Sequence, residues 1–72
     1  MNIHEAAKLL TDENCMWVRG DEGWVVCSYE GRRIGLLFVA NRDTWQRQHF
    51  YPCLADLIED KWTVGPRPEW MR

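Results

Sequence analysis

The chain has 72 residues, a formal net charge of −2, five tryptophans and three cysteines. A chain this short forms one domain and buries only about 60% of the surface of its unfolded state, so association is a common aid to its stability. The sequence shows no signal-peptide pattern and no apolar run near the roughly 18 residues of a membrane span. We therefore expect a single domain over residues 1–72, cytoplasmic and with reduced thiols, without membrane contact and with little attraction for nucleic acid.

Two short helices are expected, one in each half of the chain. Asn2 precedes an amphipathic segment over Ile3–Leu10, and Glu5 completes a capping-box pattern with it. Asn14 suits the left-handed residue that ends this helix. A second helix is predicted over Cys53–Asp60, and its apolar residues share one face: Leu54, Leu57 and Ile58.

One hairpin organises the middle of the chain. The apolar runs Trp24–Tyr29 and Arg32–Ala40 flank a turn at Glu30–Gly31 and are typical of paired strands. Both faces are apolar, and the rest of one chain can cover only one of them, so we expect a second copy to cover the other. In the first strand, alternation places Val25, Cys27 and Tyr29 on one face and Trp24, Val26 and Ser28 on the other. In the second strand it places Ile34, Leu36 and Phe38 on one face and Gly35, Leu37 and Val39 on the other.

The remaining segments complete a small sheet. We expect a short strand over Cys15–Arg19, a glycine turn over Gly20–Gly23 and a last strand over Lys61–Val64. Residues 41–51 form a loop that contains a helical turn or a fourth short strand near 46–51, and residues 65–72 form an extended tail. The predicted fold class is α+β, a small twisted antiparallel β-sheet with two short α-helices.

The sequence does not predict an enzyme. Its cysteines and its two histidines fall in no metal-ligand spacing, and Cys53 with His49 lacks an orienting carboxylate. We expect no catalytic residues, no metal and no cofactor. The five tryptophans point instead to binding, because tryptophan stacks well on flat ligands. Trp24 and Arg19, beside the glycine turn, are candidates for a small nucleotide site, although Trp24 is equally suited to the core and Arg19 to the surface.

Two stretches resemble a known family. Ala6, Lys8, Leu9-Leu10, Val18-Arg19-Gly20 and Gly23-Trp24 are similar to the opening of the anti-Thoeris sponge family of phages and prophages, and the stretch 52–64 is similar to its closing motif. The match covers about 30 of the 72 residues, at both ends only. Lys61 stands where the family has Asp, Glu59 where it has Ala and Cys53 where it has Ser.

The resemblance implies a homo-oligomeric anti-defence protein that sequesters a cyclic nucleotide immune signal, such as glycocyclic ADP-ribose, at a subunit interface without cleaving it. By motif position, Trp24, Arg19 and Asp56 would contact the ligand. Two aromatic residues of the middle segment complete our set of ligand-binding candidates, Trp45 and Tyr51. One alternative is an inhibitor, related to some anti-CRISPRs, that binds a host defence or regulatory protein and no small ligand. Another is a structural domain whose tail is a docking peptide.

Overall fold

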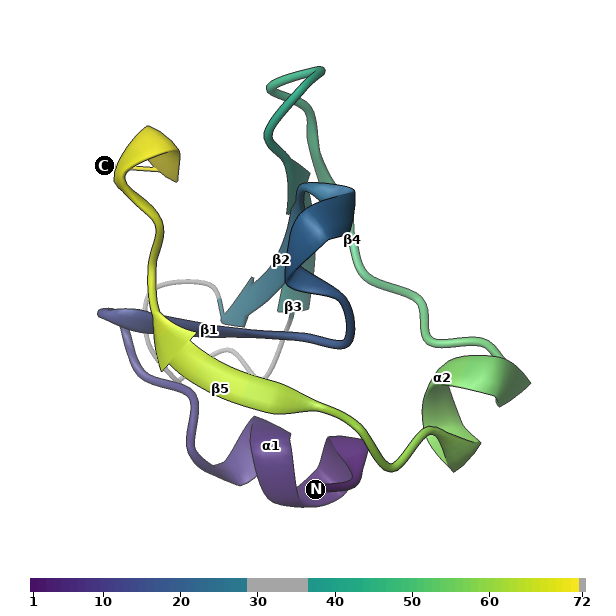
Figure 1. Ribbon diagram of the computed structural model, residues 1–72. Helices are drawn as coiled ribbons and strands as arrows, with labels where there is room; N and C mark the ends of the chain where they lie inside the picture. Colours follow the sequence, from purple (N-terminus) through teal and green to yellow (C-terminus); the bar gives the residue numbers. More distant parts are fainter. Residues whose placement is uncertain (29–36, 72) are drawn as a thin grey trace.

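The computed structural model describes residues 1–28 and 37–71, and within these ranges it contains a five-stranded antiparallel sheet, two short α-helices and two 3₁₀ turns. The strand order is β4-β3-β2-β1-β5, so the last strand lies beside the first (Figure 1). The predicted α+β class is confirmed. In chain order the elements are α1 (Ile3–Lys8), β1 (Asn14–Trp17), η1 (Gly20–Glu22), β2 (Trp24–Ser28), β3 (Leu37–Asn41), β4 (Arg47–His49), α2 (Leu54–Ile58), β5 (Thr63–Pro66) and η2 (Glu69–Met71).

Helix α1 begins at the predicted capping box. The Asn2 side chain accepts a hydrogen bond from the Glu5 N–H at 2.8 Å, and the Glu5 carboxylate accepts one from the Asn2 N–H at 3.1 Å. The prediction for Asn14 is wrong, because Asn14 opens β1 and has no left-handed backbone. Its side chain instead accepts a hydrogen bond from Thr11 N–H at 2.6 Å and donates one to the Leu9 carbonyl at 2.8 Å, which ties the helix end to the strand.

The hairpin pairs β2 with β3, with Val26 opposite Val39. The predicted alternation within each strand is confirmed for the described residues, because Val26 and Cys27 pack on opposite sides of the sheet, and so do Val39 and Phe38. The structure adds that Val26 and Val39 share one side and Cys27 and Phe38 the other. The expected turn at Glu30–Gly31 and the flanking positions 29 and 32–36 lie outside the described residues.

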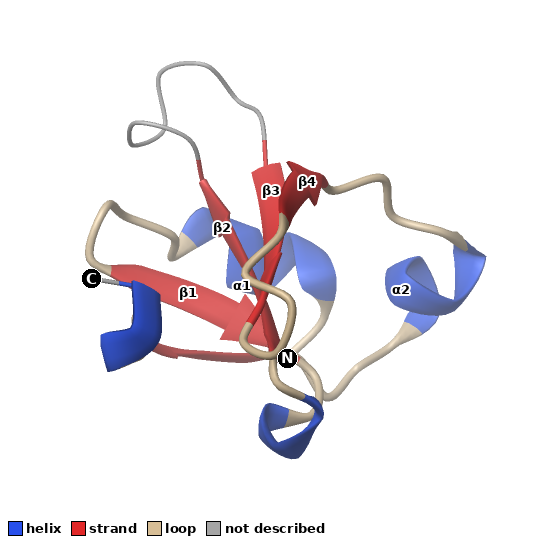
Figure 2. Ribbon diagram, turned by 90° about the horizontal axis from the view of Figure 1, so that it is seen from above, coloured by secondary structure: helices blue, strands red, loops and turns tan. Residues whose placement is uncertain are grey.

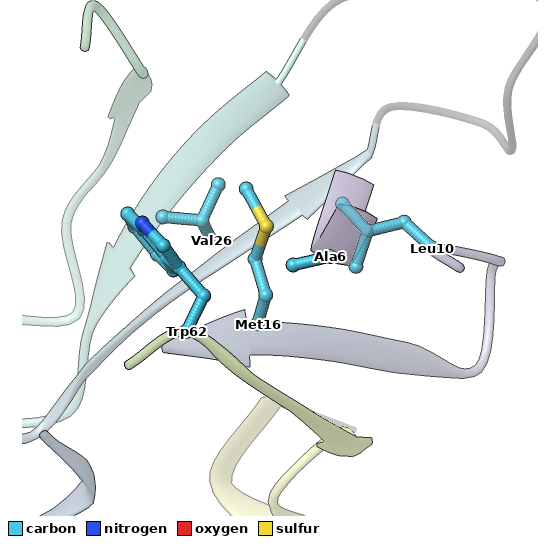
Figure 3. Packing of buried hydrophobic residues seen from close by; sticks show 5 residues of the cluster. All are labelled: Ala6, Leu10, Met16, Val26 and Trp62. Carbon is cyan, nitrogen blue, oxygen red and sulfur yellow. The ribbon is translucent and has the colours of Figure 1, made fainter. Parts of the chain in front are cut away.

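One face of the sheet carries the helix-side core. Figure 3 shows its five buried members, and Trp62, 2% exposed, closes it from the chain just before β5. Trp62 makes edge-to-face contacts with Trp24 and Phe50 at ring-centroid distances of 6.3 and 6.2 Å. Helix α1 supplies one member, the segment after it another and the strands two more, so the complete set is Ala6, Leu10, Met16, Val26 and Trp62.

The opposite face carries the tail-side core, and the end of the chain covers it. The tail predicted as extended from residue 65 instead completes β5 at Pro66 and then forms η2, whose Trp70 and Met71 pack on this face. In Figure 1, α1 lies below the β1–β5 pair and η2 above it. One chain therefore covers both faces, contrary to our expectation that a second copy is needed. The buried members of this core are Cys15, Val25, Cys27, Phe38 and Ala40.

Helix α2 stands away from the sheet, at the end of the link from β4 (Figure 2). Its apolar residues Leu54, Leu57 and Ile58, which were predicted to share a face, are 73%, 53% and 74% exposed, so that face is open to solvent. The helix is attached at its other side, where the Trp62 indole N–H donates to the Asp56 carbonyl at 3.1 Å.

Candidate ligand-binding site

An open hollow of about 170 Å³ lies at the edge of the tail-side core, and we call it the Trp17 hollow. Residues from three separate parts of the sequence line it: Trp17 comes from β1, Arg42 from the turn after β3 and Trp70 from η2. Among the described residues that line it, Arg42 carries the one charge. The lining residues are Trp17, Gly20, Gly23, Trp24, Val25, Arg42, Pro66, Pro68 and Trp70.

Two glycines hold the Trp17 ring flat against the protein. A Cβ atom on Gly65 would lie 2.5 Å from the Cη2 atom of Trp17, and a Cβ on Gly20 would lie 3.3 Å from its indole nitrogen. The benzene end of the indole therefore crosses the β5 backbone at Gly65, which is the diagonal neighbour of Trp17 across the β1–β5 pair. An aromatic ring over a strand glycine fixes the ring and compensates for the missing side chain.

The turn between β3 and β4 places a cation and another indole beside the hollow. Arg42 N–H donates to the Gly23 carbonyl at 2.6 Å, and the guanidinium lies over Gly23, whose φ of 79° suits glycine. Trp45 closes the turn with a φ of 60°, an unusual conformation for a bulky residue. Its ring meets Trp70 edge to face at 6.5 Å, so the strained residue supports one wall of the hollow.

A second hollow, of about 230 Å³, lies on the other side of Trp24, and we call it the Arg19 hollow. Arg19 forms an ion pair with Glu22 at 3.6 Å, and the Trp24 indole N–H donates to the same Glu22 carboxylate at 2.8 Å. Three carboxylates face one guanidinium here, so the electrostatics of this hollow disfavour an anion. Its lining residues are Val18, Arg19, Glu22, Trp24, Ala55, Asp56 and Glu59.

The structure brings three of the five predicted ligand-binding residues together. Arg19, Trp24 and Asp56 all line the Arg19 hollow. The Asp56 carboxylate already accepts hydrogen bonds from the Cys53 N–H at 2.9 Å and from the Cys53 thiol at 3.3 Å, as part of the α2 cap. Tyr51 is 81% exposed and stacks near His49, away from both hollows, whereas Trp45 reaches the Trp17 hollow through Trp70.

Sequence reasoning missed Trp17, Arg42 and Trp70. A strand glycine at residue 65, diagonal to an aromatic residue across the β1–β5 pair, is a signal that could have identified Trp17. No local pattern identifies Trp70, because its position depends on a tail that folds back over the sheet.

A scan against protein-family models, a search of curated proteins and a search of solved structures each found no match to this chain. In the described ranges, no helix has the length and apolar character that crossing a membrane requires.

Proposed function

We propose that this protein binds a small nucleotide, with the base in the Trp17 hollow and a phosphate on Arg42. The supporting observation is the lining: indoles and prolines surround the space, and the charge among the described lining residues is a guanidinium. Indoles stack on any base, and a guanidinium pairs with phosphate oxygens through parallel N–H donors. This assignment moves the phosphate partner from the predicted Arg19 to Arg42. Each arginine has one carboxylate partner, Glu22 for Arg19 at 3.6 Å and Asp43 for Arg42 at 3.2 Å. The Trp17 hollow, however, has no carboxylate among its lining residues, whereas three carboxylates line the Arg19 hollow.

The size of the hollow limits what it encloses. Complete ligand pockets have volumes of roughly 300–1,000 Å³, so a space of about 170 Å³ accepts one flat ring and leaves the sugar and phosphates at its mouth. A base stack contributes roughly 1–3 kcal/mol, whereas nanomolar affinity needs about 12 kcal/mol. Tight sequestration therefore requires contacts from a second copy, which is our reason to keep the site at a subunit interface.

The biological role that we propose is anti-defence. The resemblance at both ends of the chain supports a phage or prophage protein that acts in the cytoplasm of the host cell and sequesters a cyclic nucleotide immune signal without cleaving it.

Titration calorimetry with a panel of cyclic nucleotides tests the proposal, with matched arginine variants. Arg42→Ala should weaken binding about 10- to 100-fold, because a hydrogen bond to a charged group contributes roughly 1.5–3 kcal/mol. Arg19→Ala is the control and should bind within about twofold of the natural protein, because Arg19 is also paired with a carboxylate but does not line the Trp17 hollow. Saturable binding that Arg19→Ala abolishes and Arg42→Ala leaves intact would place the ligand in the other hollow.

A second candidate function is the inhibition of a host protein, and the open face of α2 favours it. A five-residue helix is not stable alone in water, and its three large apolar side chains are 53–74% exposed in the described structure. Absence of binding heat with every nucleotide, together with co-purification of one host protein that Leu54→Ser abolishes, would support this inhibitor. If the natural protein is an oligomer in solution and the same variant is a monomer that still binds nucleotide, the face contacts a second copy of the chain.

A further inference from the structure

Two buried thiols lie opposite each other on neighbouring strands. Met16 pairs with Val26 in the antiparallel β1–β2 ladder, so the next positions outward, Cys15 and Cys27, are directly opposed. Both are fully buried in the tail-side core, and their thiols share a hydrogen bond. Opposed residues in an antiparallel pair have Cα atoms about 4.5–5.5 Å apart, which lies within the range of about 4.4–6.8 Å that a disulfide spans.

The two thiols differ in their surroundings. The hydrogen bond from Cys15, with the nearby Arg67 and Arg47 guanidinium groups, lowers the pKa of Cys27. The same hydrogen bond and burial raise the pKa of Cys15 above its usual range. Arg67 is held in place because its side chain donates to the Asn14 carbonyl at 3.1 Å and to the Ser28 carbonyl at 3.3 Å. Cys27 is therefore the better nucleophile of the pair, and Cys15 is the resolving thiol.

We propose that Cys15 and Cys27 form a redox-active dithiol, which an oxidant of the disulfide class converts to an intramolecular disulfide. The Cys27 thiolate attacks one sulfur of oxidised glutathione, which forms a mixed disulfide and releases one glutathione thiolate. Cys15 then loses its proton to solvent, its sulfur attacks the Cys27 sulfur, and the second glutathione leaves as a thiolate that takes up a proton. The dithiol loses two electrons and two protons, and oxidised glutathione is reduced to two molecules of glutathione.

The C-terminal turn controls access to this dithiol. The Met71 sulfur lies 3.9 Å from the Cys27 sulfur, and Cys15 contacts the Pro66 carbonyl at 3.8 Å, so the tail covers both thiols. The oxidant reaches Cys27 only when η2 lifts from the sheet. Residues 69–71 form a single 3₁₀ turn, which is the kind of short terminal element that opens at low free-energy cost. Neither thiol lines the Trp17 hollow, so the dithiol chemistry does not use the residues of the proposed nucleotide site, although Trp70 of η2 belongs to that lining.

Peptide mapping of the natural protein provides the direct test. The protein is incubated with oxidised glutathione under native conditions, free thiols are alkylated, and trypsin digestion follows without reduction. Trypsin cleaves after Lys8, Arg19, Arg32, Arg47 and Lys61, so the two thiols fall in separate peptides, 9–19 and 20–32, and Cys53 falls in 48–61. The expected product is a linked pair of peptides 9–19 and 20–32, lighter than the sum of the reduced peptides by the mass of two hydrogens.

Matched variants separate this pairing from nonspecific oxidation. Cys53→Ser removes the exposed thiol and should leave the linked product unchanged. In Cys15→Ala, Cys27 should keep a stable glutathione adduct, and Met71→Ala should oxidise several-fold faster than the natural protein. The proposal is overturned if, after incubation with oxidised glutathione, both thiols of the natural protein are still free and become alkylated. It is also overturned if the linked peptides come from two molecules rather than one. A molar mass measured without reductant identifies the last case, because a disulfide between two molecules doubles the mass of the chain.

Discussion

Replacing Gly65 by alanine should close the Trp17 hollow from its back wall. The new Cβ would lie 2.5 Å from Trp17 Cη2 and 3.2 Å from Cζ3. Ordinary carbon contacts begin near 3.4 Å, so the benzene end of the ring must move by about 0.9 Å. The backbone of β5 cannot yield easily, because Gly65 is paired with Cys15 in the ladder. The ring therefore tips away from β5 toward the space that a base would occupy.

We expect two measurable effects of Gly65→Ala. Overpacking typically costs about 1–3 kcal/mol, and Trp17 is only half-buried, so the free energy of unfolding should fall toward the lower end of that range. Urea denaturation followed by tryptophan fluorescence measures this fall. Nucleotide affinity should fall more steeply than stability does, because a displaced indole loses its stacking geometry even in the folded protein.

Gly20→Ala is the matched control, since it approaches the opposite end of the same indole. Its Cβ would lie 3.3 Å from the Trp17 nitrogen, so a shift of a few tenths of an ångström suffices. Stability should change by less than about 1 kcal/mol, with part of the cost offset by the lower entropy of the unfolded chain. Equal effects of the two substitutions on stability and on affinity would refute the view that the close approach at Gly65 positions Trp17.

Other substitutions test the fold and its open surface. Asn2→Ala should lower the free energy of unfolding by about 1 kcal/mol through loss of the capping box, and no change in urea denaturation would contradict that role. Met16→Ala, at a fully buried position, should cost about 2–5 kcal/mol in the same assay; a smaller loss would mean that the helix-side core collapses around the gap. Ile58→Glu should alter stability by no more than about 0.5 kcal/mol. If the natural protein associates through the open face of α2, this variant should be a monomer by molar-mass measurement in solution. Deletion of residues 67–72 should destabilise the protein by about 2–4 kcal/mol, because it uncovers the tail-side core; unchanged thermal stability would show that the tail is dispensable.

Local chemistry made part of the fold predictable. The first helix depends on contacts between residues three apart, so Asn2 and Glu5 indicate its beginning without knowledge of the rest. The two faces of the hairpin follow from the alternation of side chains, which is a property of any strand. Both predictions concern interactions that the neighbouring sequence determines.

The errors concern which element covers another. The apolar spacing in α2 shows that Leu54, Leu57 and Ile58 share a face, but periodicity does not say whether a core lies against that face. The two prolines near the end of the chain favour an extended tail, yet Pro66 fits in β5 because that strand lies at the sheet edge in the described structure. Burial of Trp70 and Met71 against the tail-side core then decides the path of the tail, and the core members lie at least 30 positions away in the sequence.

The same tail explains why the predicted site was only partly right. Arg19 and Trp24 flank η1 in the chain, and Asp56 of α2 lines the same hollow. The Trp17 hollow forms only when β5 returns beside β1 and Trp70 folds over the sheet, so its residues have no common motif. Trp70 both covers the tail-side core and lines the hollow, which joins the stability of the tail to the shape of the binding space. A ligand held against Trp70 would therefore stabilise η2 by mass action, and any change that lifts η2 would weaken binding by the same coupling free energy.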